Sequence, residues 1–152
     1  MNQPPTLVTR HPDADDSPGL LLWQVTNRWQ AAQRAALKPF GLTHVQFVLL
    51  ASLTWLNGRA DGGGAVSQRR LAEHAVTDPM MTSQVLRALE QRGLLERAPD
   101  PADRRARALR VTPVGAELAN RAVAAVEACD AAFFAALGPR LPAFVQALAD
   151  LR

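Results

Sequence analysis

The sequence predicts a mainly α-helical fold with one small β-hairpin, and three observations support this fold class. Apolar residues recur at helical spacing along most of the 152-residue chain. A hydroxyl or carboxylate residue followed directly by proline opens three of the predicted helices, at Ser17, Asp78 and Thr112. The two segments that alternate like paired strands flank a loop rich in proline and aspartate. The length and an apolar fraction of 48% fit one globular domain, which we place at 17–152.

The N-terminal third is predicted to contain an arm and two helices. Residues 1–16 are polar and carry prolines, so we expect a flexible arm. The first helix begins after Ser17 and ends near Gly41. The segment Thr43-His44-Val45-Gln46 matches a capping box and opens the second helix. Apolar residues lie off the main stripe of this helix, which predicts burial on more than one side: Phe47, Leu50 and Trp55.

The central third predicts two short helices and a hairpin. After a glycine-rich loop at 57–64 and a very short strand at 65–66, Ser67 caps the first of these helices. A tight turn at 76–77 leads to the second, which begins at Pro79 and ends at about Arg92, before Gly93. Predicted strands at 94–97 and 106–111 then flank the loop 99–105.

Two amphipathic helices are predicted for the C-terminal third. The first begins after Thr112 and is broken by Gly138-Pro139, and the second occupies the remaining residues. Helices at the two chain ends have few partners inside so small a unit. We therefore expect segments 17–42 and 113–152 to pair with a second copy of the chain as a homodimer.

The segment 43–112 has the order of a helix-turn-helix followed by a wing. The major groove of B-DNA admits one α-helix, which the preceding helix braces against the backbone. The outward face of the second short helix supplies the candidate base contacts: Met80, Met81, Ser83, Gln84 and Arg87. The start of the first short helix supplies the candidate backbone contacts: Ser67, Gln68 and Arg69. On composition alone, a solvent-exposed helix face without a DNA role explains the outward face equally well.

Four arginines crowd the predicted wing, at positions 104, 105, 107 and 110. Their mutual repulsion favours a polyanionic partner, and a flexible hairpin can reach phosphates or the minor groove. The candidate wing contacts are Asp103, Arg104, Arg105 and Arg107, and we expect Asp103 to hold an arginine by a charge-assisted bond. A solvated charged loop is the alternative interpretation. The net charge of +3 is compatible with nucleic acid but does not identify it.

These segments together resemble the MarR family of bacterial regulators. The run 42–47 (Leu-Thr-His-Val-Gln-Phe) is similar to the start of the family's second helix, 86–97 to the exit of its recognition helix, and 99–105 to its wing. The resemblance covers roughly residues 20–133. It departs where Pro79, Met80 and Met81 replace the charged or hydroxyl residues that the family often has.

The resemblance implies a repressor that binds a palindromic operator in double-stranded DNA as a homodimer, with Asp103 and Arg105 acting in the wing. It also implies a pocket for a small aromatic or lipophilic ligand that releases the repressor. The candidate pocket residues are Trp23, Arg28, Trp29 and Trp55. Core or dimer packing is the other interpretation of these tryptophans.

The sequence shows no pattern typical of an enzyme, a metal site or a cofactor site. Its three histidines are scattered, and we find no nucleophile paired with a base. No run of about 18 apolar residues and no signal peptide is apparent, which predicts a cytoplasmic protein without a membrane segment. The single cysteine, Cys129, sits among apolar residues and is expected to be structural. A winged-helix protein-interaction module without DNA binding remains the alternative function.

Overall fold

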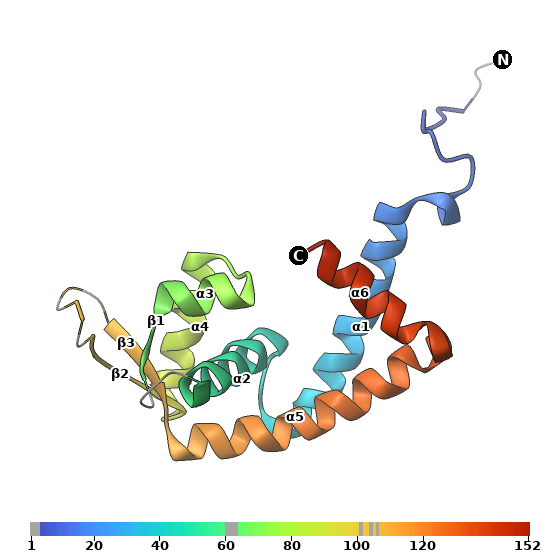
Figure 1. Cartoon of the computed structure of the whole chain (residues 1–152). Helices are drawn as coiled ribbons and strands as arrows, with labels where there is room; N and C mark the ends of the chain where they lie inside the picture. Colours follow the sequence, from blue (N-terminus) through green and yellow to red (C-terminus); the bar gives the residue numbers. More distant parts are fainter. Residues whose placement is uncertain (1–3, 60–63, 101, 104, 106) are drawn as a thin grey trace.

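The computed structural model describes residues 4–59, 64–100, 102, 103, 105 and 107–152. Its elements are the α-helices α1 (Pro18–Leu37), α2 (His44–Arg59), α3 (Gln68–Ala75), α4 (Pro79–Gln91), α5 (Pro113–Phe133) and α6 (Leu141–Asp150), the strands β1 (Val66–Ser67), β2 (Leu95–Pro99) and β3 (Arg107–Val111), and the 3-10 helices η1 (Ala14–Asp16), η2 (Lys38–Phe40) and η3 (Phe134–Arg140). Figure 1 shows α2, α3, α4 and the strands gathered in one part, the central lobe. The helical arm, made of α1, η3, α6 and the C-terminal half of α5, stands beside it.

The three predicted cap-and-proline helix starts are confirmed. The side-chain oxygens of Ser17, Asp78 and Thr112 each accept a hydrogen bond from the backbone N–H three residues later, at 3.3, 2.9 and 3.1 Å. These bonds satisfy amide groups that the first turn of a helix leaves without an intrahelical partner. The predicted capping box is confirmed as well, because Thr43 and Gln46 exchange backbone-to-side-chain bonds of 3.1 and 3.2 Å.

The N-terminal third differs from the prediction in two details. The arm contains the short helix η1, which the side chain of Asp13 caps. Helix α2 continues to Arg59, two residues beyond the position where we expected a loop to have begun. Helix α2 is buried on more than one side, as predicted, but Trp55 does not contribute, since it is 51% exposed while Phe47 and Leu50 are buried.

The predicted hairpin forms two strands of a three-stranded antiparallel sheet with the order β1-β3-β2. Leu95 pairs with Val111 and Pro99 with Arg107 at the two ends of the β2–β3 ladder. Pro99 is tolerated because β2 lies at the edge of the sheet, where one side of the strand needs no ladder partner. The very short strand expected at 65–66 is β1, which pairs with β3 at Leu109 and Ala108.

A leucine-rich core fills the space between α2, α3, α4, the sheet and α5. Helix α5 reaches this core because it begins directly against the sheet, where an added Cβ on Gly115 would lie 1.9 Å from the carbonyl oxygen of Leu94. Only glycine allows so close an approach between a helix and a neighbouring backbone. The fully buried leucines of the core are Leu37, Leu49, Leu50, Leu53, Leu71, Leu86, Leu89, Leu95 and Leu109.

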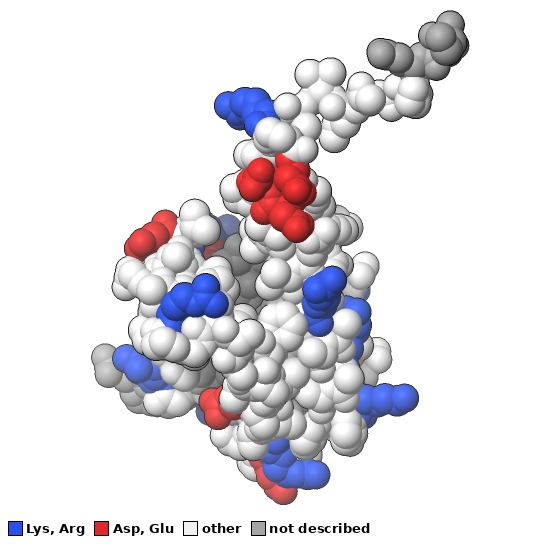
Figure 2. All heavy atoms as spheres, turned by 90° about the vertical axis from the view of Figure 1, so that its right-hand side faces the viewer, with Lys and Arg blue, Asp and Glu red and all other residues white. Residues whose placement is uncertain are grey.

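The helical arm leaves much of its apolar surface uncovered. No residue of α6 is buried. Figure 2, which views the molecule from the side of the arm, shows a broad face with few charged side chains below the acidic cluster at η1, which precedes α1. The exposed large apolar residues on α1 and α6 are Leu20, Leu21, Leu22, Trp23, Val25, Leu141, Val145 and Leu148. Such a face is typical of a surface that another protein chain covers.

By length and composition alone, the C-terminal helices are also long and apolar enough to span a membrane. Within the described residues, the stretch Pro113–Asp150 has a mean hydropathy of 1.4 in its most apolar window. This stretch is not one straight helix, because Gly138 adopts a left-handed conformation (φ 51°, ψ −128°) at the break that the sequence predicted. Two amphipathic helices meeting at a kink fit the side of a protein partner better than a bilayer span.

Candidate nucleic-acid interface

Helix α4 presents one apolar and one polar face, as a recognition helix requires. Thr82, Leu86 and Leu89 are buried and hold the helix on the core. Met80 is 75% exposed, and Gln84 and Arg87 are also exposed on the opposite side. The outward face therefore offers a methionine thioether, an amide and a guanidinium, which suit a thymine methyl, adenine and guanine respectively.

Two of the predicted base-contact residues do not lie on the most exposed face of α4. Ser83 is half-buried. Met81 lines a hollow together with residues of α1 and α2, so its side chain lies at the boundary between the outward face and the helical arm. The structure thus groups Met80, Gln84 and Arg87 and sets Met81 apart.

The turn between α3 and α4 is held in a strained conformation. Val76 has φ 52° and ψ 50°, a left-handed region that a β-branched residue rarely adopts. A pair of threonines fixes the exit from this turn, because the hydroxyls of Thr77 and Thr82 lie 2.7 Å apart and the hydroxyl of Thr82 donates to the carbonyl of Asp78 at 2.7 Å. The angle between α3 and α4 is therefore fixed by the local chain.

The start of α3 contains the three predicted backbone contacts. The hydroxyl oxygen of Ser67 accepts a bond from the N–H of Arg70 at 3.1 Å, which leaves its hydrogen free to donate. Arg69 is exposed and forms an ion pair with Glu73 at 2.8 Å. Gln68 is half-buried, and its carbonyl oxygen accepts a bond from Arg97. Gln68 and Arg69 line a groove of about 740 Å³ that α3 shares with Pro79 at the start of α4.

The wing carries its arginines outward. Arg105 and Arg107 are exposed, as is Asp103, whereas Arg104 lies outside the described residues. Asp103 accepts a bond from the backbone N–H of Arg105 at 2.9 Å. This carboxylate holds Arg105 by its backbone and shapes the turn, and in the described part of the chain it bonds to no arginine side chain.

Asn57 joins the end of α2 to the wing. Its Oδ1 accepts from the N–H of Val111 at 2.8 Å, and its Nδ2 donates to the carbonyls of Leu109 and Gly64 at 3.3 and 3.1 Å. One side chain thus satisfies three backbone groups on β3 and on the segment before β1. The sequence analysis missed this residue, since an asparagine before glycine is typical of a loop.

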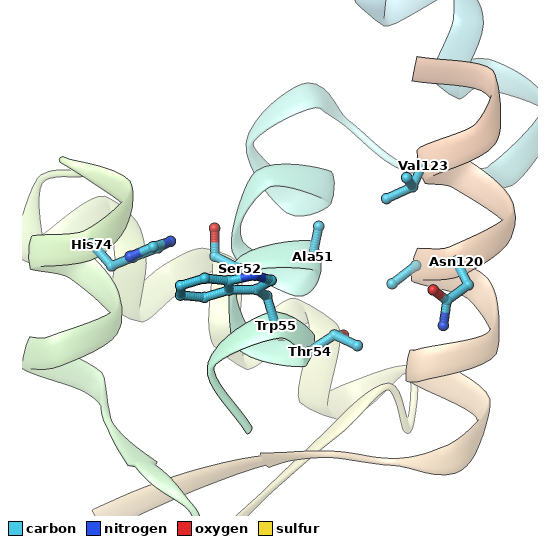
Figure 3. Close-up of a pocket in the computed structure, with 8 residues that line it drawn as sticks. Ala51, Ser52, Thr54, Trp55, His74, Asn120 and Val123 are labelled. Carbon is cyan, nitrogen blue, oxygen red and sulfur yellow. The ribbon is translucent and has the colours of Figure 1, made fainter. Parts of the chain in front are cut away.

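The four candidate pocket residues do not converge on one site. Trp23 and Arg28 are exposed on α1, and Trp29 and Trp55 belong to different hollows. Trp55 lines a cavity of about 500 Å³ between α2, α3 and α5, shown in Figure 3. Its indole ring stacks on His74 at a centroid distance of 5.3 Å, and Asn120 and Val123 form the opposite wall.

The second hollow lies between α1 and the central lobe and has a volume of about 440 Å³. Its lining combines the Trp29 and His44 rings, which meet edge to face at 5.0 Å, with Arg34 and a set of aliphatic side chains. Burial lowers the pKa of His44 below its ordinary 6.5, the nearby Arg34 guanidinium lowers it further, and Asp130 acts in the opposite direction. His44 is therefore predominantly neutral at pH 7.

Asp130 of α5 holds the Trp29 ring that lines this hollow. One of its oxygens accepts bonds from the Trp29 indole N–H at 2.7 Å and from the fully buried Gln33 amide at 2.6 Å. The network fixes α1 against α5, and with it the orientation of the helical arm. Sequence analysis did not reveal it because Asp130 lies 101 and 97 positions from Trp29 and Gln33, and nothing in the local pattern marks Asp130.

Comparison with known proteins agrees with this geometry. The model of the MarR family matches residues 42–106, which include the helix-turn-helix and most of the wing. The HTH-type transcriptional regulator YdcH of Bacillus subtilis is 46% identical over 120 residues, which cover 79% of this chain and 80% of YdcH. The chain belongs to the MarR family. Its relatives are regulators of transcription, and it is a DNA-binding transcriptional regulator of the MarR type.

Two further MarR-family proteins have a similar fold. The HTH-type transcriptional repressor Rv2887 of Mycobacterium tuberculosis is 38% identical over 125 residues, which cover 82% of this chain and 85% of the repressor. Its complex with DNA matches at a TM-score of 0.68, with 34% identity and coverage of 89% and 97% of the two chains. A MarR-family regulator from Rhodococcus sp. RHA1 matches at a TM-score of 0.81, with 27% identity and coverage of 93% and 96%.

Proposed function

We propose that this MarR-family regulator represses transcription by binding a palindromic operator as a homodimer. The observation that carries the proposal is the outward face of α4, with Met80, Gln84 and Arg87, followed along the chain by an arginine-bearing wing. In this role, α4 enters the major groove, and Arg105 and Arg107 reach phosphates or the minor groove. The function is binding without catalysis, and it is exerted in the cytoplasm, where a bacterial chromosome is read.

The homodimer is supported by the uncovered face of the helical arm. The apolar residues exposed on α1 and α6 have no partner in the described part of a single chain that would remove them from water. Pairing two such faces about a two-fold axis buries them and places two α4 helices for successive major grooves, about 34 Å apart. The dimer is therefore part of the reading mechanism, because an isolated protomer contacts only half of a palindrome.

A small aromatic acid is the proposed releasing ligand. Rv2887 has been crystallised with salicylic acid, and that complex matches this chain at a TM-score of 0.69 with 36% identity, covering 91% of this chain and 99% of Rv2887. The hollow at Trp29 combines an aromatic wall with Arg34, which suits an aromatic ring and its carboxylate. A ligand that favours a non-binding spacing of the two α4 helices by about 1.4 kcal/mol lowers DNA affinity about tenfold.

The test is a fluorescence-anisotropy titration with the duplex upstream of the gene itself, at two salt concentrations. We expect tight binding that weakens steeply with salt, because arginines displace counterions from the phosphates. Arg105→Ala is expected to weaken binding about tenfold, and Arg121→Ala, which removes an exposed arginine from α5, serves as the matched control with no such effect.

The outcomes separate the functions. Loss of affinity in both arginine variants would indicate a general charge effect and would remove the wing role of Arg105. Absence of binding at low salt by a folded dimer would favour the protein-interaction module. Salicylate added to the wild-type complex is expected to release the duplex, and Arg34→Gln is expected to abolish that release while leaving DNA binding unchanged.

A further inference from the structure

Arg97 on β2 connects three elements of the DNA-reading unit. Its Nε donates to Glu90 of α4 at 3.1 Å, and its Nη1 donates to Oε1 of Gln68 at the start of α3 at 3.0 Å. The Arg97 side chain is only 18% exposed, so water competes weakly for these bonds. We propose that Arg97 is a positioning residue that orients the Gln68 amide so that its Nε2 donates to a DNA backbone phosphate, an inference that rests on the proposed DNA binding.

The chemistry of the guanidinium fixes which end of the amide faces it. Arginine carries only donors, so Gln68 must turn its carbonyl oxygen toward Arg97. The amide NH2 group is then directed away from Arg97. Among the described residues no hydrogen bond from Nε2 of Gln68 is found, which leaves both of its hydrogens for another acceptor.

The surroundings of Gln68 favour a phosphate as that acceptor. Gln68 and Arg69 line the same groove, which α3 shares with the N-terminal end of the proposed recognition helix α4. A phosphate beside this helix pair contacts an amide donor and a guanidinium at once, which is how backbone contacts fix the register of a recognition helix. Without Arg97, the amide rotates freely and presents its oxygen to the phosphate as readily as its nitrogen.

The arrangement also carries a cost that a purely structural role does not explain. Nη2 of Arg97 is buried with no hydrogen-bond partner in the described part of the chain. An unpaired buried donor destabilises the fold relative to an apolar side chain of similar size. The two bonds that Arg97 does make both lead to elements of the DNA-reading unit, α3 and α4.

The test combines variants with duplexes in which single phosphates are replaced by neutral methylphosphonates. In the wild-type protein, we expect one replacement in each half-site to lower affinity about tenfold because it removes the Gln68 acceptor. Gln68→Glu keeps the acceptor for Arg97 but replaces the donor by a carboxylate oxygen. This variant is expected to unfold at an unchanged or higher temperature, to bind the normal duplex at least tenfold more weakly, and to recover affinity on the methylphosphonate duplex.

Arg97→Lys and Glu90→Gln complete the experiment. A lysine cannot hold both partners in the planar geometry of a guanidinium, so Arg97→Lys is expected to lose most of the penalty from that single methylphosphonate. Glu90→Gln changes the other partner of the same guanidinium and leaves the Gln68 bond in place, so it is expected to keep the penalty. Circular dichroism and thermal unfolding confirm that each variant is folded.

Two results would overturn the inference. If Gln68→Glu and Arg97→Lys both retain the full methylphosphonate penalty, Gln68 does not contact that phosphate and Arg97 serves packing alone. If no single replacement affects the wild-type protein although it binds the duplex, no such contact exists. Failure of the wild-type protein to bind the duplex at low salt would instead overturn the proposed function, and this inference with it.

Discussion

Leu53 in α2 and Leu148 in α6 are both leucines on the apolar side of a helix, yet Leu53 is fully buried and Leu148 is 44% exposed. The same difference in burial distinguishes the central lobe, which contains Leu53, from the helical arm, which contains Leu148. The central lobe closes its own core with leucines from α2, α3, α4 and the strands. The helical arm is buried only near its base, at Leu37, Val126 and the Gln33 amide that binds Asp130, whereas no residue of α6 is buried.

This contrast separates folding from assembly. The central lobe holds its DNA-reading elements with contacts inside one chain, so its geometry does not depend on a second copy. The spacing between two such lobes depends on the arm, because the uncovered apolar face of α1 and α6 belongs to the arm. A ligand that acts on the spacing therefore needs to reach the junction between the two parts, where the Trp29 hollow lies.

The largest effect is expected at Gly115, where the arm helix α5 meets the central lobe. Gly115→Ala places a methyl group against the carbonyl of Leu94, and we expect a loss of about 3 kcal/mol in the free energy of unfolding. Gly19→Ala is the matched control in α1, where nothing lies within 4 Å of the added Cβ. This control is expected to stabilise the protein by up to about 1 kcal/mol. Urea titrations measure both changes, and equal changes in the free energy of unfolding for the two variants would contradict the close contact between Gly115 and Leu94.

An intermediate effect is expected when charge enters the uncovered face of α6. The double change Val145→Asp and Leu148→Asp is expected to convert the dimer to a monomer and to weaken operator binding about tenfold or more, because each half-site then binds alone. The central lobe is expected to stay folded, since neither residue touches its core. Light scattering measures the mass of the variant, and fluorescence anisotropy measures its affinity for the operator. A variant that remains dimeric would place the interface elsewhere.

The smallest effect is a pH dependence of stability from His44, which lies between the two parts. Its pKa is lowered in the folded state, so the unfolded chain binds more protons as the pH falls below about 6.5. Stability is therefore expected to be complete above that pH and to decrease as the pH drops from about 7 to 5. His44→Phe keeps an aromatic ring beside Trp29 and is expected to flatten this part of the profile in urea titrations. If the variant has the same pH profile as the wild-type protein, His44 is not the source of this dependence of stability on pH.

Sequence analysis predicted the elements whose signals are local. Ser17, Asp78 and Thr112 cap the helices they were expected to cap, because a cap bond needs only a side chain and the next three residues. Helix α4 and the hairpin were found for the same reason, since each depends on a short period in the chain. The family resemblance, now confirmed, depended on several such local signals in a fixed order.

The interactions that join distant parts of the chain were not predictable in this way. Arg97 was seen only as the last residue of a motif, whereas its function follows from bonds to Gln68 and Glu90 on two other elements. Trp55 was expected to be buried because it lies off the main apolar stripe of α2, but it faces a cavity between α2, α3 and α5, where its half-exposed ring stacks on His74. The tryptophans do not share one pocket, because Trp29 lines the hollow between α1 and the central lobe and Trp55 lines the cavity between α2, α3 and α5.

The bonds of Asn57 have a consequence for the chemical ageing of this protein. Asn57 precedes Gly58, and asparagine deamidates most readily before glycine because no side chain hinders closure of the succinimide ring. Helical backbone in α2 and the three hydrogen bonds of the side chain hold the amide away from the geometry of ring closure. If the last turn of α2 unfolds and Asn57 becomes aspartate, a carboxylate oxygen faces the carbonyls of Leu109 and Gly64 where a donor stood. The Asn57 bonds from α2 to Leu109 and Gly64 would then be lost irreversibly, so the fraction of damaged molecules would record how long the end of α2 had spent unfolded.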